Sequence, residues 1–303
     1  MSSLTLRRTQ TLLPAVDGTL AEGAFNSDAD QVVFDLEDSV HPTEKTAARD
    51  ELITTLDTVD SNDKIVGFRI NGVDTRWWYD DVIQVIQNVG EHIDILGVPK
   101  ITSANQVVAV DKLLTQVEVN AGLEPGTIGL ECLVERASAM NNVSEIATAS
   151  ERVETLIFGP GDYSASIGIG GPVDDHYGNY PGHFWHYALS RIVHSAKGAG
   201  LQVVDGLYPR VDDTDGFRQL CQWGKMLGCD GKVAINSKQI AIANEVFTPS
   251  KAEAEKASLI VETYEDASGT SGTFPTVEGE IIDEETYHLS KQIMARAVEA
   301  GVL

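Results

Sequence analysis

The sequence has few cysteines and no long hydrophobic run. Its three cysteines, Cys132, Cys221 and Cys229, make an odd set without metal-type spacing, which favours reduced thiols packed as small apolar side chains. No stretch approaches the roughly 18 consecutive apolar residues of a membrane span, and the N-terminus lacks the apolar segment of an export signal. We therefore expect a soluble cytoplasmic protein that does not act at a membrane.

Basic residues are also scarce. The 22 Lys and Arg residues stand against 46 Asp and Glu residues, and the formal charge is −24. Such a charge opposes sequence-independent binding to nucleic acid, so we expect no nucleic-acid partner. The acidic excess is dispersed along the chain, and repulsion of this kind is screened within about 3 Å at 1 M salt. Adaptation to concentrated salt is therefore a hypothesis.

Several common catalytic motifs are absent. No G-x-G-x-x-G follows the first predicted strand, and neither G-x-S-x-G nor H-E-x-x-H occurs. These absences argue against a dinucleotide-binding sheet, a hydrolase with a nucleophile elbow and a zinc peptidase.

Eight short apolar or β-branched runs recur at fairly even spacing. The predicted strands are Thr11–Leu13, Val32–Leu36, Ile65–Ile70, Ile95–Val98, Gly129–Val134, Thr155–Phe158, Gln202–Val204 and Lys232–Ile235. Helical patterns lie between them at Thr43–Leu56, Trp77–Val89, Ala104–Ala121, Ser138–Thr148, His183–Ala199 and Thr214–Leu227. This alternation predicts an α/β protein with a parallel sheet, most simply a (β/α)8 TIM barrel, with an open doubly wound sheet as the alternative.

The chain beyond the eighth strand cannot belong to the barrel wall. Its pattern predicts helices at Gln239–Glu245, from Ser250 to about Glu265, and at about Glu284–Ala300. The stretch Asp266–Glu280 is rich in Gly, Ser, Thr and Pro and has the composition of a mobile connection. We expect a TIM-barrel catalytic domain at 1–246 and a C-terminal helical extension and lid at 247–303.

Polar residues gather where the predicted strands end, which is where such barrels carry their chemistry. They are Asp35, Glu37 and Asp38 after the second strand, Arg69 and Asn71 after the third, Lys100 after the fourth, Glu135 and Arg136 after the fifth, Asp162 after the sixth and Asp205 after the seventh. The acids of the second strand repel one another, so a fold keeps them together only if a cation, basic partners or a task compensates. The convergence of both charges predicts an active site.

Glu135 and Asp162 follow adjacent strands, so both carboxylates can reach one point above the barrel. Two carboxylates with room for water and a bidentate oxygen substrate suit Mg²⁺. The turn at Gly161 leaves backbone N–H groups exposed to an anionic ligand, and Arg69 supplies a fixed charge for an oxyanion or a carboxylate. Metal-assisted carbon–carbon cleavage or condensation through an enolate fits these parts. A Schiff base on Lys100 is the alternative.

The chain resembles the citrate lyase β-subunit and malyl-CoA lyase group of Mg²⁺-dependent barrel lyases, within the HpcH/HpaI aldolase family. The resemblance covers most of the chain in order and includes RRTQTLLPA near the start, DADQVVFDLEDSVHPTEKTAAR at 28–49, FRIN at 68–71, VPKI at 98–101, LVERA at 133–137 and ASERVETLIFGPGDYSASIG at 149–168. The segment WHY at 185–187 and the turn GPGD at 159–162 are more similar to malyl-CoA lyases than to citrate lyase subunits.

The resemblance implies roles for the residues at the strand ends. Glu135 and Asp162 would bind Mg²⁺, with Mn²⁺ as an alternative ion, and Arg69 would face the enolate oxygen of the thioester. Glu37 and Asp38 would hold metal-bound waters and Arg69. Lys100 and Gly161 are further candidates for substrate contacts.

Two residues near the ends of the chain are also implicated by the resemblance. Arg8 resembles the arginine that contacts the CoA end of the substrate. The segment GEIIDEE resembles a G-x-hydrophobic-hydrophobic-D pattern, so Asp283 matches the aspartate that closes over a neighbouring subunit's site and protonates the enolate. A homotrimer or homohexamer with the lid exchanged between subunits follows.

The reaction implied is a retro-Claisen cleavage of a 3-hydroxyacyl-CoA, such as malyl-CoA or β-methylmalyl-CoA, to glyoxylate and acetyl-CoA or propionyl-CoA. Its partners are an acyl-CoA and a 2-oxo acid. The alternatives are citramalyl-CoA cleavage, a malyl-CoA thioesterase or malate synthase-type activity, and a noncatalytic lyase-like binding subunit. Gly23 stands where the family often has a lysine, which removes one contact to a CoA phosphate.

Overall fold

The computed structural model describes residues 5–169, 183–267 and 274–303. They form two compact units, of which the first is Arg7–Asn244 and the second is built on Glu245–Leu303. Across the described ranges, no helix has both the length and the apolar character that crossing a bilayer requires.

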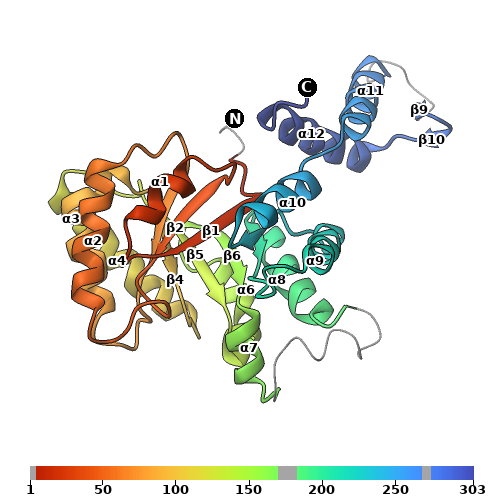
Figure 1. Ribbon diagram of the computed structural model, residues 1–303. Coiled ribbons are helices and arrows are strands. Elements are labelled where there is room, and N and C mark those ends of the chain that lie inside the picture. The colour runs from red at the N-terminus through yellow and green to blue at the C-terminus, as the bar shows by residue number, and fades with distance from the viewer. Residues whose placement is uncertain (1–4, 170–182, 268–273) are drawn as a thin grey trace. The chain divides into compact units, whose positions relative to one another are not determined.

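The first unit is a closed barrel of eight parallel strands in chain order (Figure 1). The strands are β1 Thr9–Pro14, β2 Gln31–Asp35, β3 Ile65–Arg69, β4 Ile95–Val98, β5 Gly129–Val134, β6 Val153–Phe158, β7 Gln202–Asp205 and β8 Gly231–Ala234. Pairing of β8 with β1, which sets Lys232 opposite Thr9, closes the ring. The predicted (β/α)8 fold is confirmed, and the open-sheet alternative is wrong.

Helices surround the barrel on its outer face, with α2, α3 and α4 next to one another and α8 beside α9 (Figure 1). They are α1 Thr19–Phe25, α2 Lys45–Thr58, α3 Trp78–Val89, the 3-10 turn η1 Gly90–His92, α4 Ala104–Ala121, α5 Ala137–Asn141, α6 Val143–Ala147, α7 Pro160–Ser166, α8 His186–Gly198, α9 Thr214–Leu227 and α10 Ser237–Phe247.

Local sequence explains where α9 begins and ends. Asp213 precedes the helix, and its carboxylate accepts a hydrogen bond from the Gly216 N–H, which satisfies one of the free donors of the first turn. Gly228 follows with a φ of 102°, a left-handed conformation that glycine adopts at no steric cost.

Side chains that line the barrel interior form three layers, because alternate residues of each strand point inward. The floor contains Gln10, Gln31, Glu131 and Thr155, which are buried and are aligned across neighbouring strands. The middle layer contains Leu12, Val33, Leu133, Ile157, Val204 and Val233. The top layer contains Asp35, Arg69 and Glu135, at the carboxyl ends of the strands.

Three segments differ from the sequence-based expectation. The helix predicted at Ser138–Thr148 is divided into α5 and α6 at Asn142, whose side-chain amide donates to the Thr102 carbonyl oxygen instead of continuing the helix pattern. The turn at Gly161 is part of the short helix α7, which begins at Pro160, a residue suited to the first helical position. Helix α1 was missed because it is short and carries little apolar periodicity.

The second unit consists of α11 (Lys251–Ala267), α12 (Glu284–Glu299) and a small hairpin of β9 (Thr276–Val277) and β10 (Glu280–Ile281). The hairpin replaces part of the expected mobile connection, while residues 268–273 of that connection lie outside the described residues. Its two turn residues, Glu278 and Gly279, both have positive φ, which matches the right-handed twist of a tight hairpin. Ile260, Val277 and Ile282 form the small hydrophobic core of this second unit.

Candidate functional site

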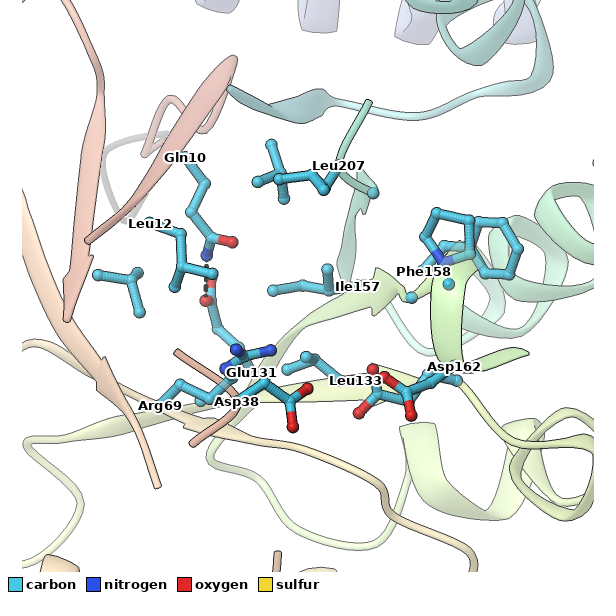
Figure 2. Close-up of a pocket in the computed structure, with 18 of the residues that line it drawn as sticks. Gln10, Leu12, Asp38, Arg69, Glu131, Leu133, Ile157, Phe158, Asp162 and Leu207 are labelled. Carbon is cyan, nitrogen blue, oxygen red and sulfur yellow. Dashed lines mark hydrogen bonds between the residues drawn. The ribbon is translucent and has the colours of Figure 1, made fainter. Parts of the chain in front are cut away.

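A cavity of about 380 Å³ opens among the carboxyl ends of the strands and continues down the barrel interior. Figure 2 shows Arg69, Asp38 and Asp162 toward one end of this space and Gln10 toward the other. The cavity therefore connects a charged rim with the polar floor through the apolar middle layer.

Asp35 holds Arg69 in a fixed orientation. Its two carboxylate oxygens accept hydrogen bonds from Arg69 Nε at 2.8 Å and Nη2 at 2.7 Å, the bidentate geometry that guanidinium and carboxylate favour. The same carboxylate accepts the backbone N–H groups of Glu37 and Ser39. Burial would raise the pKa of Asp35, but the hydrogen bonds and charge of Arg69 outweigh it, so that pKa is lowered. Asp35 therefore remains ionised.

Lys100 joins the other two acids of the second strand end. Its Nζ lies 2.7 Å from Glu37 Oε1 and 2.6 Å from Asp38 Oδ1. Burial opposes the charge of Lys100, yet its hydrogen bonds to Asp38 and Glu37 raise its pKa well above the usual range. Glu37 also lies 3.4 Å from Arg69 Nη1. Because Lys100 is held as a cation, the geometry disfavours it as the neutral amine that a Schiff base requires.

Glu135 is positioned by the backbone of Lys100. Lys100 has a φ of 52°, a left-handed conformation that is uncommon for a residue other than glycine, and its N–H donates to Glu135 Oε1 at 2.6 Å. Burial raises the pKa of Glu135 to about 8, although the hydrogen bond from Lys100 lowers it, and the nearby charge of Glu37 raises it further. Gly159 packs against Glu135, where a Cβ would lie 2.4 Å from Oε2.

The arrangement of Glu135 and Asp162 suits a divalent cation. Asp162 lies in the first turn of α7, is 40% exposed at its side chain and stands 3.9 Å from Lys100 Nζ. Glu37 Oε2 is buried and accepts no hydrogen bond from the described residues. Burial is the main cause of the raised pKa of Glu135, and the charges of Glu37 and Asp162 add to it. A cation between these carboxylates would relieve that added repulsion.

No group of three or more His, Cys, Asp or Glu side chains within the described ranges forms a complete ligand set. Mg²⁺ does not require one, because it usually binds one or two carboxylates and completes its octahedron with water and substrate oxygens. Glu135 and Asp162 therefore fit a Mg²⁺ ion held jointly by protein and substrate.

The sequence-based reasoning missed Lys45, which stabilises the acidic turn, the segment 35–38 after β2. Lys45 is 5% exposed, and its Nζ donates to the carbonyl oxygens of Leu36 at 2.8 Å and Glu37 at 2.6 Å. Burial lowers its pKa, against the attraction of Asp35. The sequence did contain a signal for this contact, because Lys45 is the first residue of α2, the helix that follows the acidic turn.

A second support holds Asn71 at the end of β3. Asp81 is fully buried, and its Oδ2 accepts hydrogen bonds from the backbone N–H and the side-chain amide of Asn71 at 2.9 and 2.7 Å. Arg49 pairs with the other oxygen of Asp81 at 2.8 Å. This chain of contacts fixes the strand end that carries Arg69.

Three predicted site residues are not part of this group. Asp205, at the end of β7, is buried and pairs with Lys232 Nζ at 2.5 Å. Arg8 directly precedes β1, so it lies at the amino ends of the strands, where its guanidinium pairs with Asp30 at 2.6 Å. Asp283 belongs to the second unit and caps α12, with its Oδ1 accepting the Thr286 N–H at 2.8 Å. A hydrogen bond from the Thr286 side chain, together with the one from the Thr286 N–H, lowers the pKa of Asp283.

Comparison with known proteins identifies relatives along nearly the whole chain. Residues 8–237 match the family model described as HpcH/HpaI aldolase/citrate lyase. An L-malyl-CoA/beta-methylmalyl-CoA lyase from Rhodobacter capsulatus is 36% identical over 98% of this chain and 96% of its own length. A (3S)-malyl-CoA thioesterase from Cereibacter sphaeroides is 33% identical over 96% of this chain and 94% of its own length.

A solved structure shares the fold. The protein CitE from Mycobacterium tuberculosis, in complex with magnesium, acetoacetate and coenzyme A, aligns with a TM-score of 0.74 at 23% identity and covers 96% of this chain and 97% of that one. The relatives of similar length agree with the match to the family model. The chain belongs to the HpcH/HpaI aldolase/citrate lyase family.

Proposed function

We propose that this protein is a Mg²⁺-dependent carbon–carbon lyase that cleaves or forms a 3-hydroxyacyl-CoA of the malyl-CoA or β-methylmalyl-CoA type. The proposal is carried by one observation: Arg69, held in a fixed orientation by Asp35, lies on the same cavity rim as the carboxylates Glu135 and Asp162. The similarity to an L-malyl-CoA/beta-methylmalyl-CoA lyase supports the choice of substrate.

Each group has a task that its surroundings allow. A Mg²⁺ ion on Glu135 and Asp162 would supply positive charge to the carboxylate and oxo oxygens of a 2-oxo acid. Arg69, fixed by Asp35, would donate hydrogen bonds to the enolate oxygen of the thioester, whose charge develops during cleavage. Glu37 and Lys100 would keep Arg69 and the acidic turn in place.

We assign to Asp283 the delivery of a proton to the enolate carbon. This Asp283 would come from a neighbouring copy of the chain in a homo-oligomer. Proton transfer by a positioned acid contributes about 10²–10⁴-fold to a rate. Asp283→Ala should therefore lower turnover by about that factor while Mg²⁺ binding persists, and Glu285→Ala, at an exposed acid two residues away, should not. Near-normal turnover of the Asp283 variant would refute this role.

The test of the proposed reaction is product analysis with malyl-CoA, β-methylmalyl-CoA and citramalyl-CoA, each with and without EDTA. We expect glyoxylate with acetyl-CoA or propionyl-CoA from the first two, and loss of both products with EDTA. Absence of carbon–carbon cleavage with all three substrates in the presence of Mg²⁺ would reject the proposal.

A thioesterase is the second candidate, because a (3S)-malyl-CoA thioesterase is 33% identical to this chain. The two activities differ in one product. Free CoA and malate without acetyl-CoA would indicate hydrolysis, whereas acetyl-CoA with glyoxylate indicates cleavage.

A further inference from the structure

The cavity extends well below the charged rim. Glu131 and Glu135 both line it from β5 or its carboxyl end and are four residues apart, which corresponds to about 13 Å along the strand. A small 2-oxo acid and an acetyl group at the rim would leave the deeper part of this space unused.

An apolar collar surrounds the deeper part. It consists of Leu12, Val33, Leu133, Ile157 and Val233, which come from five strands and all line the cavity. Of these, Leu133, Ile157 and Val233 also belong to one buried cluster. The collar has no polar side chain, so it favours a hydrocarbon group over a charged or hydroxylated one.

A polar floor closes the collar. Gln10 Nε2 donates to Glu131 Oε2 at 2.6 Å, and Figure 2 shows Gln10 at the end of the cavity away from Arg69, Asp38 and Asp162. Glu131 is 1% exposed, and its Oε1 lies 3.7 Å from Arg7 Nε, so this carboxylate is already paired within the protein. A hydrocarbon chain that reached the floor would meet the polar Gln10 and Glu131 side chains and gain no apolar contact there, so the floor limits the length of a chain that enters the collar.

We propose that the collar is a subsite for a linear alkyl branch on the acyl carbon next to the thioester carbonyl, and that it accepts branches longer than methyl. The assignment rests on the proposed lyase function, because the acyl carbon is placed at the rim by Arg69 and the candidate metal ligands. Burial of each methylene favours binding by about fourfold until the chain meets Glu131.

The test is condensation of glyoxylate with acetyl-CoA, propionyl-CoA, butyryl-CoA, valeryl-CoA and octanoyl-CoA, measured as kcat/KM. We expect butyryl-CoA and valeryl-CoA to react within about tenfold of acetyl-CoA, and octanoyl-CoA to fail. A drop of more than 100-fold between propionyl-CoA and butyryl-CoA would overturn the subsite. Failure with acetyl-CoA as well would instead reject the proposed function.

Variants of Leu133 locate the subsite. Leu133→Phe should fill the collar and lower kcat/KM for valeryl-CoA at least tenfold more than for acetyl-CoA. Leu133→Ala should widen it and shift the preference toward valeryl-CoA, which keeps the proposal testable if the larger side chain prevents folding. Val108→Phe, at an exposed position of α4, is the matched control and should change kcat/KM for neither acetyl-CoA nor valeryl-CoA. Equal losses for both thioesters in both Leu133 variants would contradict the assignment.

Discussion

The two ends of the barrel use the same residue types for different purposes. At the amino ends of β5 and β6, Arg152 donates to Glu118 at 2.9 Å, Asp111 at 2.7 Å and Thr115 at 2.9 Å, and also to the Ile128 carbonyl oxygen at 2.8 Å. Glu118 in turn accepts the backbone N–H groups of Gly126 and Ile128, both at 2.9 Å. Every donor of this arginine is used within the protein.

The rim at the carboxyl ends is less completely paired than the cluster around Arg152. Glu37 Oε2 accepts no hydrogen bond among the described residues and meets Arg69 Nη1 only as an ion pair at 3.4 Å, and Asp162 is 40% exposed. Burial opposes the charge of Glu118 but its hydrogen bonds with Arg152 lower its pKa, whereas burial raises the pKa of Glu135 to about 8. Ion pairs that satisfy one another stabilise a fold, while carboxylates left short of partners can bind a ligand.

The strongest test of this contrast is Glu135→Gln at the rim. Loss of a candidate metal ligand should remove several kcal/mol of charge stabilisation, or on the order of 10³-fold in turnover, without loss of thermal stability. Turnover is measured with malyl-CoA, Mg²⁺ binding by calorimetry and stability by thermal unfolding. Mg²⁺ affinity equal to that of the unmodified protein would exclude Glu135 as a ligand.

Glu118→Gln is the counterpart at the amino end. It leaves the charge of buried Arg152 partly uncompensated, which should lower the free energy of unfolding by about 3–5 kcal/mol. Turnover per folded molecule should not change. Denaturant unfolding and activity at a temperature below the transition measure the two effects, and a large loss of turnover would break the proposed division between the ends.

The same variant tests pH dependence. The pKa of Glu118 is lower in the folded protein than in the unfolded chain, so its contribution to stability is present above the unfolded value of about 4.5 and is lost as pH falls through the folded value. On going from pH 6 to acid conditions, the free energy of unfolding should therefore fall less for Glu118→Gln than for the unmodified protein. At low pH the denaturant unfolding curves of the two proteins should approach each other. Parallel pH profiles would contradict it.

Lys45→Met should have a smaller effect on turnover. Methionine retains much of the buried volume but cannot donate to the Leu36 and Glu37 carbonyl oxygens, so the acidic turn loses its support. Outer residues of this kind are typically worth about 10–100-fold in metal affinity or activity. Arginine at position 45 should restore part of the turnover, and a Lys45→Met protein with unchanged Mg²⁺ affinity and turnover would refute the positioning role.

The smallest effect concerns the whole surface. With 46 acidic and 22 basic residues, repulsion should weaken as salt rises, and the melting temperature should increase by several degrees between low and molar KCl. A melting temperature that stays constant or falls would reject adaptation to concentrated salt.

The sequence was sufficient for the barrel because its signals are local and repeated. Each strand is a short apolar run between helical segments, and the residue that ends it lies at the catalytic end by the geometry of the fold. This is why the sequence alone places Arg69, Lys100, Glu135 and Asp162 on one rim. Arg8 could have been placed at the other end by the same rule, since it precedes the first strand.

Which charges face each other was decided only by the tertiary structure. Asp35 rather than Glu37 accepts the hydrogen bonds from Nε and Nη2 of Arg69, because β2 and β3 align Asp35 and Arg69 in register. The left-handed backbone of Lys100 gained its role from Glu135, which is 35 residues away, and Lys45 gained its role from the fold of the turn between β2 and α2. By itself the sequence determined the barrel fold and the position of each residue between the amino and carboxyl ends of the strands. The direction of a side chain and the partners it meets depend on packing between strands and loops, which no local pattern encodes.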